Sequence, residues 1–125
     1  MSVGVDLVDV PGFAEQLADR ASGFVEGTFT PLEQRTAQGD PSRLAARYAA
    51  KEAFIKAWSG SRRGLPPLLG AVDLREIEVV DDGYGRPALT LHGTLAGVVG
   101  PCTTSLSLSH DGDSAIAVVL FQSGT

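Results

Sequence analysis

The sequence predicts a single α+β domain in which a largely antiparallel sheet packs against one long central helix. Three observations favour this class: helical patterns in the first half of the chain, two hairpin patterns in the second half, and one long helical segment between them. The chain has 125 residues, enough for one compact core, so we expect one domain over residues 1–125.

Residues 2–8 predict the first strand. Apolar side chains at positions 3, 5 and 7 alternate with polar or small ones at 2, 4 and 6, which is the period of a strand. Asp6 is therefore expected on the face opposite the apolar side chains.

Two helices are expected before the central one. Asp9, with a proline two residues later, is typical of an N-cap, so a helix is expected from residue 10 to as far as residue 21. A second helix is expected to begin near residue 30. The loop that follows it offers Asp40 or Ser42 as an N-cap for the central helix.

The central helix is expected over residues 42–59, which contain neither glycine nor proline. Residues 59–70, with three glycines and two prolines, indicate a long connection. The remaining elements are strands at 77–80, 87–91, 103–109 and 115–121, which form two hairpins, and one or two helical turns at 93–99.

Composition excludes several classes of protein. Hydrophobic residues make up 43% and charged residues 20%, as in globular proteins and unlike disordered ones. No apolar run approaches the roughly 20 residues that span a bilayer, and the N-terminus lacks the order of a signal peptide. We therefore expect a cytoplasmic protein with no membrane partner. Cys102 is the single cysteine, which excludes an intramolecular disulfide and a cysteine-based zinc site.

The charge is unevenly distributed along the chain. The net charge of −5 argues against a nucleic-acid partner. Residues 35–63 nevertheless hold seven basic residues and only two acidic ones. This segment suits phosphates or an acidic partner, although charge alone would equally describe a solvated basic face.

Three polar residues of the predicted strand and central helix are candidates for a phosphate-handling site. Glu52 and Lys56 are one helical turn apart and lie between two arcs of apolar or small side chains. Asp6 would meet Glu52 if the first strand packs on the central helix, and two carboxylates suit magnesium. Two simpler interpretations stay open: a surface Glu–Lys pair worth about 0.2–0.5 kcal/mol, and a solvent-facing or turn-capping Asp6.

Four motifs in order resemble those of a known family. Residues 4–8 (GVDLV) and 47–57 (RYAAKEAFIKA) look like the two-part signature of 4′-phosphopantetheinyl transferases, and the chain length is similar to that of the holo-acyl-carrier-protein synthase family. Residues 85–87 (GRP) resemble a turn of that family. The pair of segments 105–110 (SLSLSH) and 115–119 (AIAVV) resembles its closing hairpin.

The resemblance implies an activity, a fold and an assembly. The activity is magnesium-dependent transfer of 4′-phosphopantetheine from coenzyme A to a serine of apo-acyl carrier protein, with release of 3′,5′-ADP, in fatty acid or polyketide biosynthesis. Manganese is an alternative metal. The implied fold is that of the 4′-phosphopantetheinyl transferases, and the implied assembly is a homotrimer with active sites between neighbouring subunits.

The resemblance also implies roles for individual residues. Asp6 and Glu52 match the metal ligands, and Lys56 matches a lysine near the pyrophosphate, so these three are the expected catalytic residues. Glu52 is our candidate for the base that accepts the serine proton. The residues expected to bind coenzyme A are Lys56, Arg47, Gly85, Arg86, Pro87 and His110.

Some assignments and two other functions stay open. His110 is alternatively a turn residue before Asp111-Gly112. The basic residues that are candidates for the carrier protein or the 3′-phosphate are Arg20, Arg35, Arg43, Arg47 and Lys51. The other functions are a non-catalytic trimeric module that binds coenzyme A or an acidic protein, and a metal-dependent hydrolase that cleaves a pyrophosphate with water.

Overall fold

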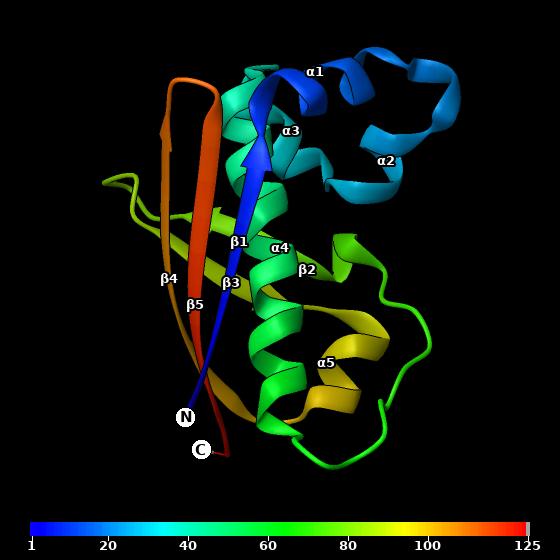
Figure 1. Ribbon diagram of the computed structural model, residues 1–125, viewed down its shortest axis with the longest axis vertical. Coiled ribbons are helices and arrows are strands. Elements are labelled where there is room, and N and C mark those ends of the chain that lie inside the picture. The colour runs from blue at the N-terminus through cyan, green and yellow to red at the C-terminus, as the bar shows by residue number, and fades with distance from the viewer. Residues whose placement is uncertain (125) are drawn as a thin grey trace.

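The computed structural model describes residues 1–124 and has the predicted α+β architecture (Figure 1). Its elements in chain order are β1 (Ser2–Asp9), α1 (Val10–Ala18), α2 (Phe24–Thr28), α3 (Pro31–Ala37), α4 (Pro41–Ser61), β2 (Ile77–Asp81), β3 (Pro87–Leu91), α5 (Gly93–Val99), β4 (Cys102–Asp111) and β5 (Ser114–Ser123). Single 3-10 turns occur at Arg20–Ser22 and Leu74–Glu76. All strand pairs are antiparallel, in one sheet of order β1-β5-β4 and one two-stranded sheet of β2 and β3.

The long helix α4 covers the inner face of the three-stranded sheet (Figure 1). Its N-cap is Asp40, whose carboxylate accepts a hydrogen bond from the backbone N–H of Ser42 at 2.9 Å. The side of α4 that packs in the core is rich in alanine, and β5 faces it with alternate residues. The buried residues concerned are Ala49, Ala50, Ala53, Ala57, Ala117, Val119 and Phe121. Small side chains on the helix allow the strands to approach it closely.

Gly4 marks the closest approach of β1 to α4. A Cβ atom at this position would overlap the carbonyl oxygen of Ala53 and lie 2.6 Å from the backbone nitrogen of Ala57. Only glycine fits between the two backbones without moving one of them. This contact fixes the height of β1 above the helix, and with it the position of Asp6.

The apolar face of β1 points away from the helix. Gly4 and Asp6 face α4, while Val3, Val5 and Leu7 are exposed on the outer face of the sheet. These three residues are paired across the strands with Leu120, Val118 and Ile116 of β5, which are exposed as well. We call these six residues the outer apolar stripe.

The N-terminal helices differ in part from the sequence expectation. Helix α1 ends at Ala18 instead of Ala21, and helix α2 was not expected from the sequence. The ring of Phe24 packs edge-on against Phe13 at 5.6 Å and against Phe29 at 6.5 Å between centroids. This aromatic cluster stabilises α2, although two of the residues at 23–27 are glycines.

A buried ion pair connects α3, α4 and β2. The Lys51 ammonium donates to Glu33 at 2.8 Å and to the carbonyl oxygens of Leu74 and Ile77, and both charged side chains are fully buried. Glu33 also accepts the backbone N–H of Val79 at 2.8 Å. Loss of hydration lowers the pKa of Lys51, although Glu33 opposes that shift. The expectation that Lys51 meets a carrier protein or a phosphate is therefore wrong.

None of the helices within residues 1–124 is both long and apolar enough to cross a membrane.

Candidate functional site

Asp6 and Glu52 lie on the wall of one open hollow between β1, α1 and α4. The hollow has a volume of about 420 Å³, and its lining includes Asp6, Asp9, Phe13, Gln16, Tyr48 and Glu52. We call it the carboxylate hollow. Asp6 comes from the strand face that packs on α4, and Glu52 from the middle of that helix, so the tertiary packing brings the two carboxylates together.

Lys56 joins the helix to the strand at the edge of this hollow. Its ammonium donates to Asp6 at 2.9 Å and to the carbonyl oxygen of Val5 at 3.0 Å. The Lys56 side chain is 56% exposed and that of Asp6 is 17% exposed. The spacing of Glu52 and Lys56 on the helix would allow an ion pair between them. Lys56 instead forms its ion pair with Asp6.

The carboxylates of the hollow fit a magnesium ion whose other ligands are water molecules and phosphate oxygens. Within residues 1–124 there is no cluster of three or more His, Cys, Asp or Glu side chains suited to a metal. Asp6 and Glu52 supply two carboxylates, which is the usual protein share at a magnesium site that also binds water and phosphate oxygens. Two oxygen donors without nitrogen or sulfur disfavour zinc.

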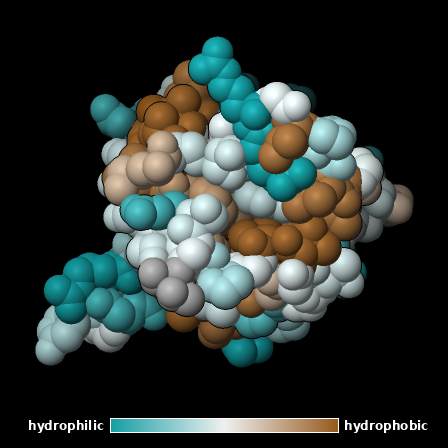
Figure 2. Space-filling view, turned by 90° about the horizontal axis from the view of Figure 1, so that it is seen from below, coloured by the Kyte–Doolittle hydropathy of each residue, from teal (hydrophilic) through white to brown (hydrophobic). Residues whose placement is uncertain are grey.

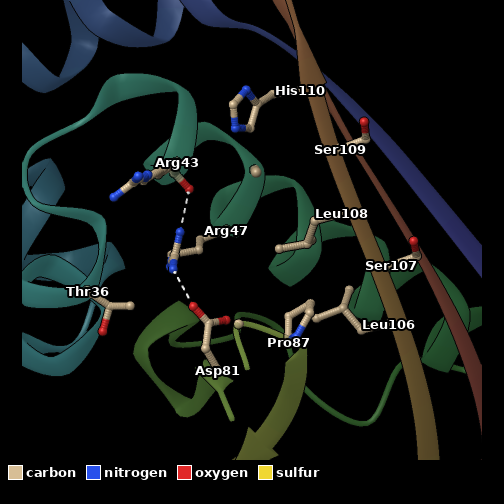
Figure 3. A pocket seen from close by; sticks show the side chains of 12 residues that line it. Thr36, Arg43, Arg47, Asp81, Pro87, Leu106, Ser107, Leu108, Ser109 and His110 are labelled. Carbon is tan, nitrogen blue, oxygen red and sulfur yellow. Dashed lines mark hydrogen bonds and ion pairs between the residues drawn. The ribbon is translucent and has the colours of Figure 1, made fainter. Parts of the chain in front are cut away.

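A second pocket lies on the other side of α4, against β4 and the start of β3 (Figure 3). It has a volume of about 350 Å³ and is lined by residues that include Arg43, Arg47, Asp81, Gly85, Pro87 and His110. We call it the arginine pocket. Figure 3 shows Leu106 and Leu108 of β4 pointing toward it, whereas Ser107 and Ser109 point away.

Arg47 forms the wall of the arginine pocket on the helix side. Its guanidinium donates to the carbonyl oxygen of Arg43 at 3.1 Å and to Asp81 at 3.2 Å (Figure 3). The side chain is only 8% exposed, and its buried Nε atom has no hydrogen-bond partner among the described residues. Two arginines on the pocket wall, Arg43 and Arg47, favour binding of an anion in this pocket.

Arg86 lies outside the arginine pocket. Its guanidinium contacts Asp82 at 2.7 Å, packs over the ring of Tyr84 at 4.9 Å, and is largely exposed. Backbone and side-chain hydrogen bonds from Arg86 lower the pKa of Asp82. The turn therefore offers Gly85 and Pro87 to the pocket, while Arg86 points into solvent.

The structure divides the predicted site residues into two groups at opposite edges of the sheet. Asp6, Glu52 and Lys56 lie at the β1 edge, whereas Arg47, Gly85, Pro87 and His110 lie at the β4 edge. The carboxylate hollow and the arginine pocket share no lining residue. Since β5 lies between the two edge strands, β1 and β4 are separated by two strand spacings, or about 10 Å.

Two residues of these pockets were not expected from the sequence. Asp81 pairs with Arg47, which lies 34 positions earlier in the chain, and no local sequence pattern predicts such a contact. Tyr48 enters the carboxylate hollow one turn before Glu52, a spacing that the sequence contains but that indicates only a shared helix face.

Comparison with known proteins supports the resemblance in the sequence. Residues 2–119 match the family model described as the 4′-phosphopantetheinyl transferase superfamily. The chain is 48% identical over 126 residues to a holo-[acyl-carrier-protein] synthase from Mycobacterium bovis, covering 98% of this chain and 96% of that relative.

Solved structures give the same picture. An ACPS-CoA complex from Chronobacterium ammoniagenes is 48% identical, with a TM-score of 0.91, and the match covers 99% of this chain and 98% of that one. A holo-(acyl-carrier-protein) synthase from Bacillus anthracis, in complex with CoA (3′,5′-ADP), is 28% identical with a TM-score of 0.73, covering 98% of this chain and 96% of that one.

Proposed function

This chain belongs to the 4′-phosphopantetheinyl transferase superfamily, and from that membership we propose that it is a holo-acyl-carrier-protein synthase. It transfers 4′-phosphopantetheine from coenzyme A to a serine of apo-acyl carrier protein and releases 3′,5′-ADP. The observation that carries this assignment is that Asp6 and Glu52 line one hollow, with Lys56 paired to Asp6, in a chain of this family. A role in fatty acid or polyketide biosynthesis and a cytoplasmic location remain expectations.

Asp6 and Glu52 are our candidates for the metal ligands. A magnesium ion bound there would neutralise charge on the pyrophosphate and help to orient it, and manganese is an alternative. The fit rests on the two carboxylates that line the carboxylate hollow.

Lys56 and Glu52 have separate tasks in this proposal. The exposed Lys56 ammonium reaches the edge of the hollow, where it can neutralise or protonate the leaving phosphate of coenzyme A. Glu52 accepts the proton of the carrier serine as its oxygen attacks the β-phosphorus. The P–O bond to the leaving 3′,5′-ADP breaks in the same displacement.

The arginine pocket is our candidate for the phosphates and adenosine of coenzyme A. Arg47, Gly85, Pro87 and His110 line it, and the two arginines on its wall, Arg43 and Arg47, support an anion there. Arg86 takes part only if it leaves Asp82. Arg20, Arg35 and Arg43 are exposed and remain candidates for steering an acidic carrier protein.

A homotrimer with active sites between subunits belongs to the same proposal. The two groups of candidate residues lie at opposite edges of one sheet, so neighbouring chains would complete each other's sites. The outer apolar stripe supports self-association because monomers rarely expose contiguous apolar patches of this kind. Figure 2 shows apolar side chains in patches on the end of the molecule that carries both termini.

The test is a mass measurement on apo carrier proteins. Incubation of this protein with coenzyme A, magnesium and a panel of apo carriers should add one phosphopantetheine mass to a carrier. The assignment is lost if no carrier gains mass. Release of 3′,5′-ADP without any carrier would favour a hydrolase instead, and binding of coenzyme A without either product would favour a binding module.

A further inference from the structure

A phenol group lies beside Glu52 in the carboxylate hollow. Tyr48 precedes Glu52 by one turn of α4, so the two side chains share one face of the helix, and both line the hollow. Burial raises the pKa of the Tyr48 hydroxyl, and the neighbouring Glu52 raises it further as a charge and as a hydrogen-bond acceptor. The phenol and the carboxylate therefore lie on the same side of α4, at the hollow where the candidate chemistry takes place.

Two other helices hold the ring of Tyr48. Its centroid lies 5.3 Å from that of Phe13 on α1 and 5.9 Å from that of Phe24 on α2. Aromatic rings at these distances pack favourably and restrict one another's orientation. The direction of the hydroxyl is therefore set by the packing of α1 and α2, and only in part by the helix that carries Tyr48.

Glu52 forms no ion pair within residues 1–124. Lys56, one turn away, pairs with Asp6 and the carbonyl oxygen of Val5. Lys51, the preceding residue, is buried with Glu33 on another side of α4. With both cations engaged elsewhere, the Tyr48 hydroxyl is left as a neighbouring group of α4 that can donate to the Glu52 carboxylate.

We propose that Tyr48 is a positioning residue whose hydroxyl donates to one oxygen of Glu52 and leaves the other oxygen free to face the carboxylate hollow. This inference rests on the proposed function, in which Glu52 binds the metal and accepts the serine proton. A carboxylate already held in one orientation loses less freedom when it binds an ion or a proton. Tyr48 therefore acts through Glu52 and does not contact the reacting atoms.

The test is Tyr48→Phe, which keeps the ring and removes only the hydroxyl. We expect a kcat about tenfold lower with the KM for coenzyme A nearly unchanged, as for a lost hydrogen bond to a charged group. Binding of Mn²⁺ to the protein without coenzyme A, measured from the EPR signal of the free ion, should weaken by a similar factor. The thermal unfolding midpoint should stay close to that of the wild type, because the ring packing is retained.

Tyr84→Phe is the matched control. Tyr84 is the other tyrosine of the chain, is 85% exposed at the β2–β3 turn, and lies outside the carboxylate hollow. It should leave both kcat and Mn²⁺ affinity unchanged. The inference is overturned if Tyr48→Phe retains the wild-type kcat and Mn²⁺ affinity, or if Tyr84→Phe loses as much as Tyr48→Phe. If the wild type modifies no carrier, the proposed function fails, and the Mn²⁺ measurement still decides the role of Tyr48.

Discussion

Glu52 is distinguished from Asp6 by its surroundings. Asp6 is paired with Lys56, whereas Glu52 is half-buried in the carboxylate hollow without a basic partner in the described chain. A carboxylate that no cation neutralises keeps its capacity to bind a metal ion or accept a proton. This difference makes Glu52 the better candidate for the base and Asp6 the better candidate for a ligand held in place.

Glu52→Gln should separate activity from stability. The substitution keeps the size of the side chain and removes its charge, so we expect transfer to the carrier to fall by about 100-fold or more. The thermal midpoint should change little because no ion pair is lost. Glu15→Gln, at an exposed position of α1, is the matched control and should retain the wild-type rate. Normal transfer by Glu52→Gln would exclude it as base and as essential ligand.

Glu78 should make stability depend on pH in the acidic range. The Thr30 hydroxyl at 2.6 Å, and then His92, hold the pKa of Glu78 below its usual value of 4.5. Because the folded-state pKa lies below the unfolded one, Glu78 stabilises the fold above its unfolded pKa. That contribution is lost as the pH falls through the folded pKa.

Unfolding of the wild type and Glu78→Gln should therefore be compared from pH 7 to pH 3. The free energies of unfolding should differ most near neutral pH and converge in acid. A difference that stays constant over this range would show that the charge of Glu78 does not matter.

At the scale of elements, the contact between β1 and α4 positions the site. Gly4 allows the strand to lie against the backbone of Ala53 and Ala57, and two residues later the same strand presents Asp6 to the hollow. A change in the spacing of these two elements therefore alters both the core and the distance between the two carboxylates.

Gly4→Ala should destabilise the protein by about 2 kcal/mol and reduce transfer, because the new methyl group pushes β1 away from α4. Chemical denaturation and the carrier mass assay would measure the two effects. Gly97→Ala is the matched control, since a Cβ at this exposed position of α5 meets no atom within 4 Å. Gly97→Ala should leave the free energy of unfolding unchanged or increase it slightly. Equal stability of both variants would contradict the close approach of β1 and α4.

The buried pair of Lys51 and Glu33 connects elements that are far apart in the sequence. Lys51→Met leaves the Glu33 carboxylate buried without its cation, and we expect a loss of about 3–5 kcal/mol in the free energy of unfolding. Adding Glu33→Gln should recover part of that loss, because the uncompensated charge is removed. Arg75→Met, which breaks an exposed pair with Asp73, is the control and should cost less than about 1 kcal/mol. Additive effects of the two buried substitutions would argue against a coupled pair.

At the scale of the whole molecule, the outer apolar stripe is the main surface that the fold leaves without a partner. Its six residues form three cross-strand pairs on β1 and β5, on the face of the sheet opposite α4.

Val5→Glu should dissociate the proposed trimer, because it places a charge in the middle of the outer apolar stripe. Sedimentation velocity should show a shift from trimer to monomer, with loss of transfer if neighbouring subunits complete the site. Leu65→Glu is the matched control and should leave the trimer intact. Leu65 is an apolar residue, 61% exposed, on the connection after α4. A trimer that survives Val5→Glu would exclude this face as the interface.

Much of the architecture could be predicted because it follows from local patterns. The capping signals of Asp9 and Asp40, the alternation in β1 and β5, and the two hairpin turns all act within a few residues. Helix α2 was missed because aromatic packing with Phe13 and Phe29 stabilises it, and its own residues do not. The role suggested for Lys51, a contact with the carrier protein or the 3′-phosphate, was wrong because the residue is buried with Glu33. That partner lies 18 positions earlier, beyond the reach of any local pattern.

The sequence by itself determined the family and the α+β class, since periodicity and motif order are contained in the chain. It also supplied Asp6, Glu52 and Lys56 as candidate site residues. Only the tertiary structure decided that Lys56 pairs with Asp6, that Tyr48 and Glu52 line a hollow beside β1 and α1, and that the arginine pocket lies at the opposite edge of the sheet. These contacts join residues whose distance is set by how β1, β4 and α4 pack. Packing depends on the shape of the whole core, which no local pattern encodes.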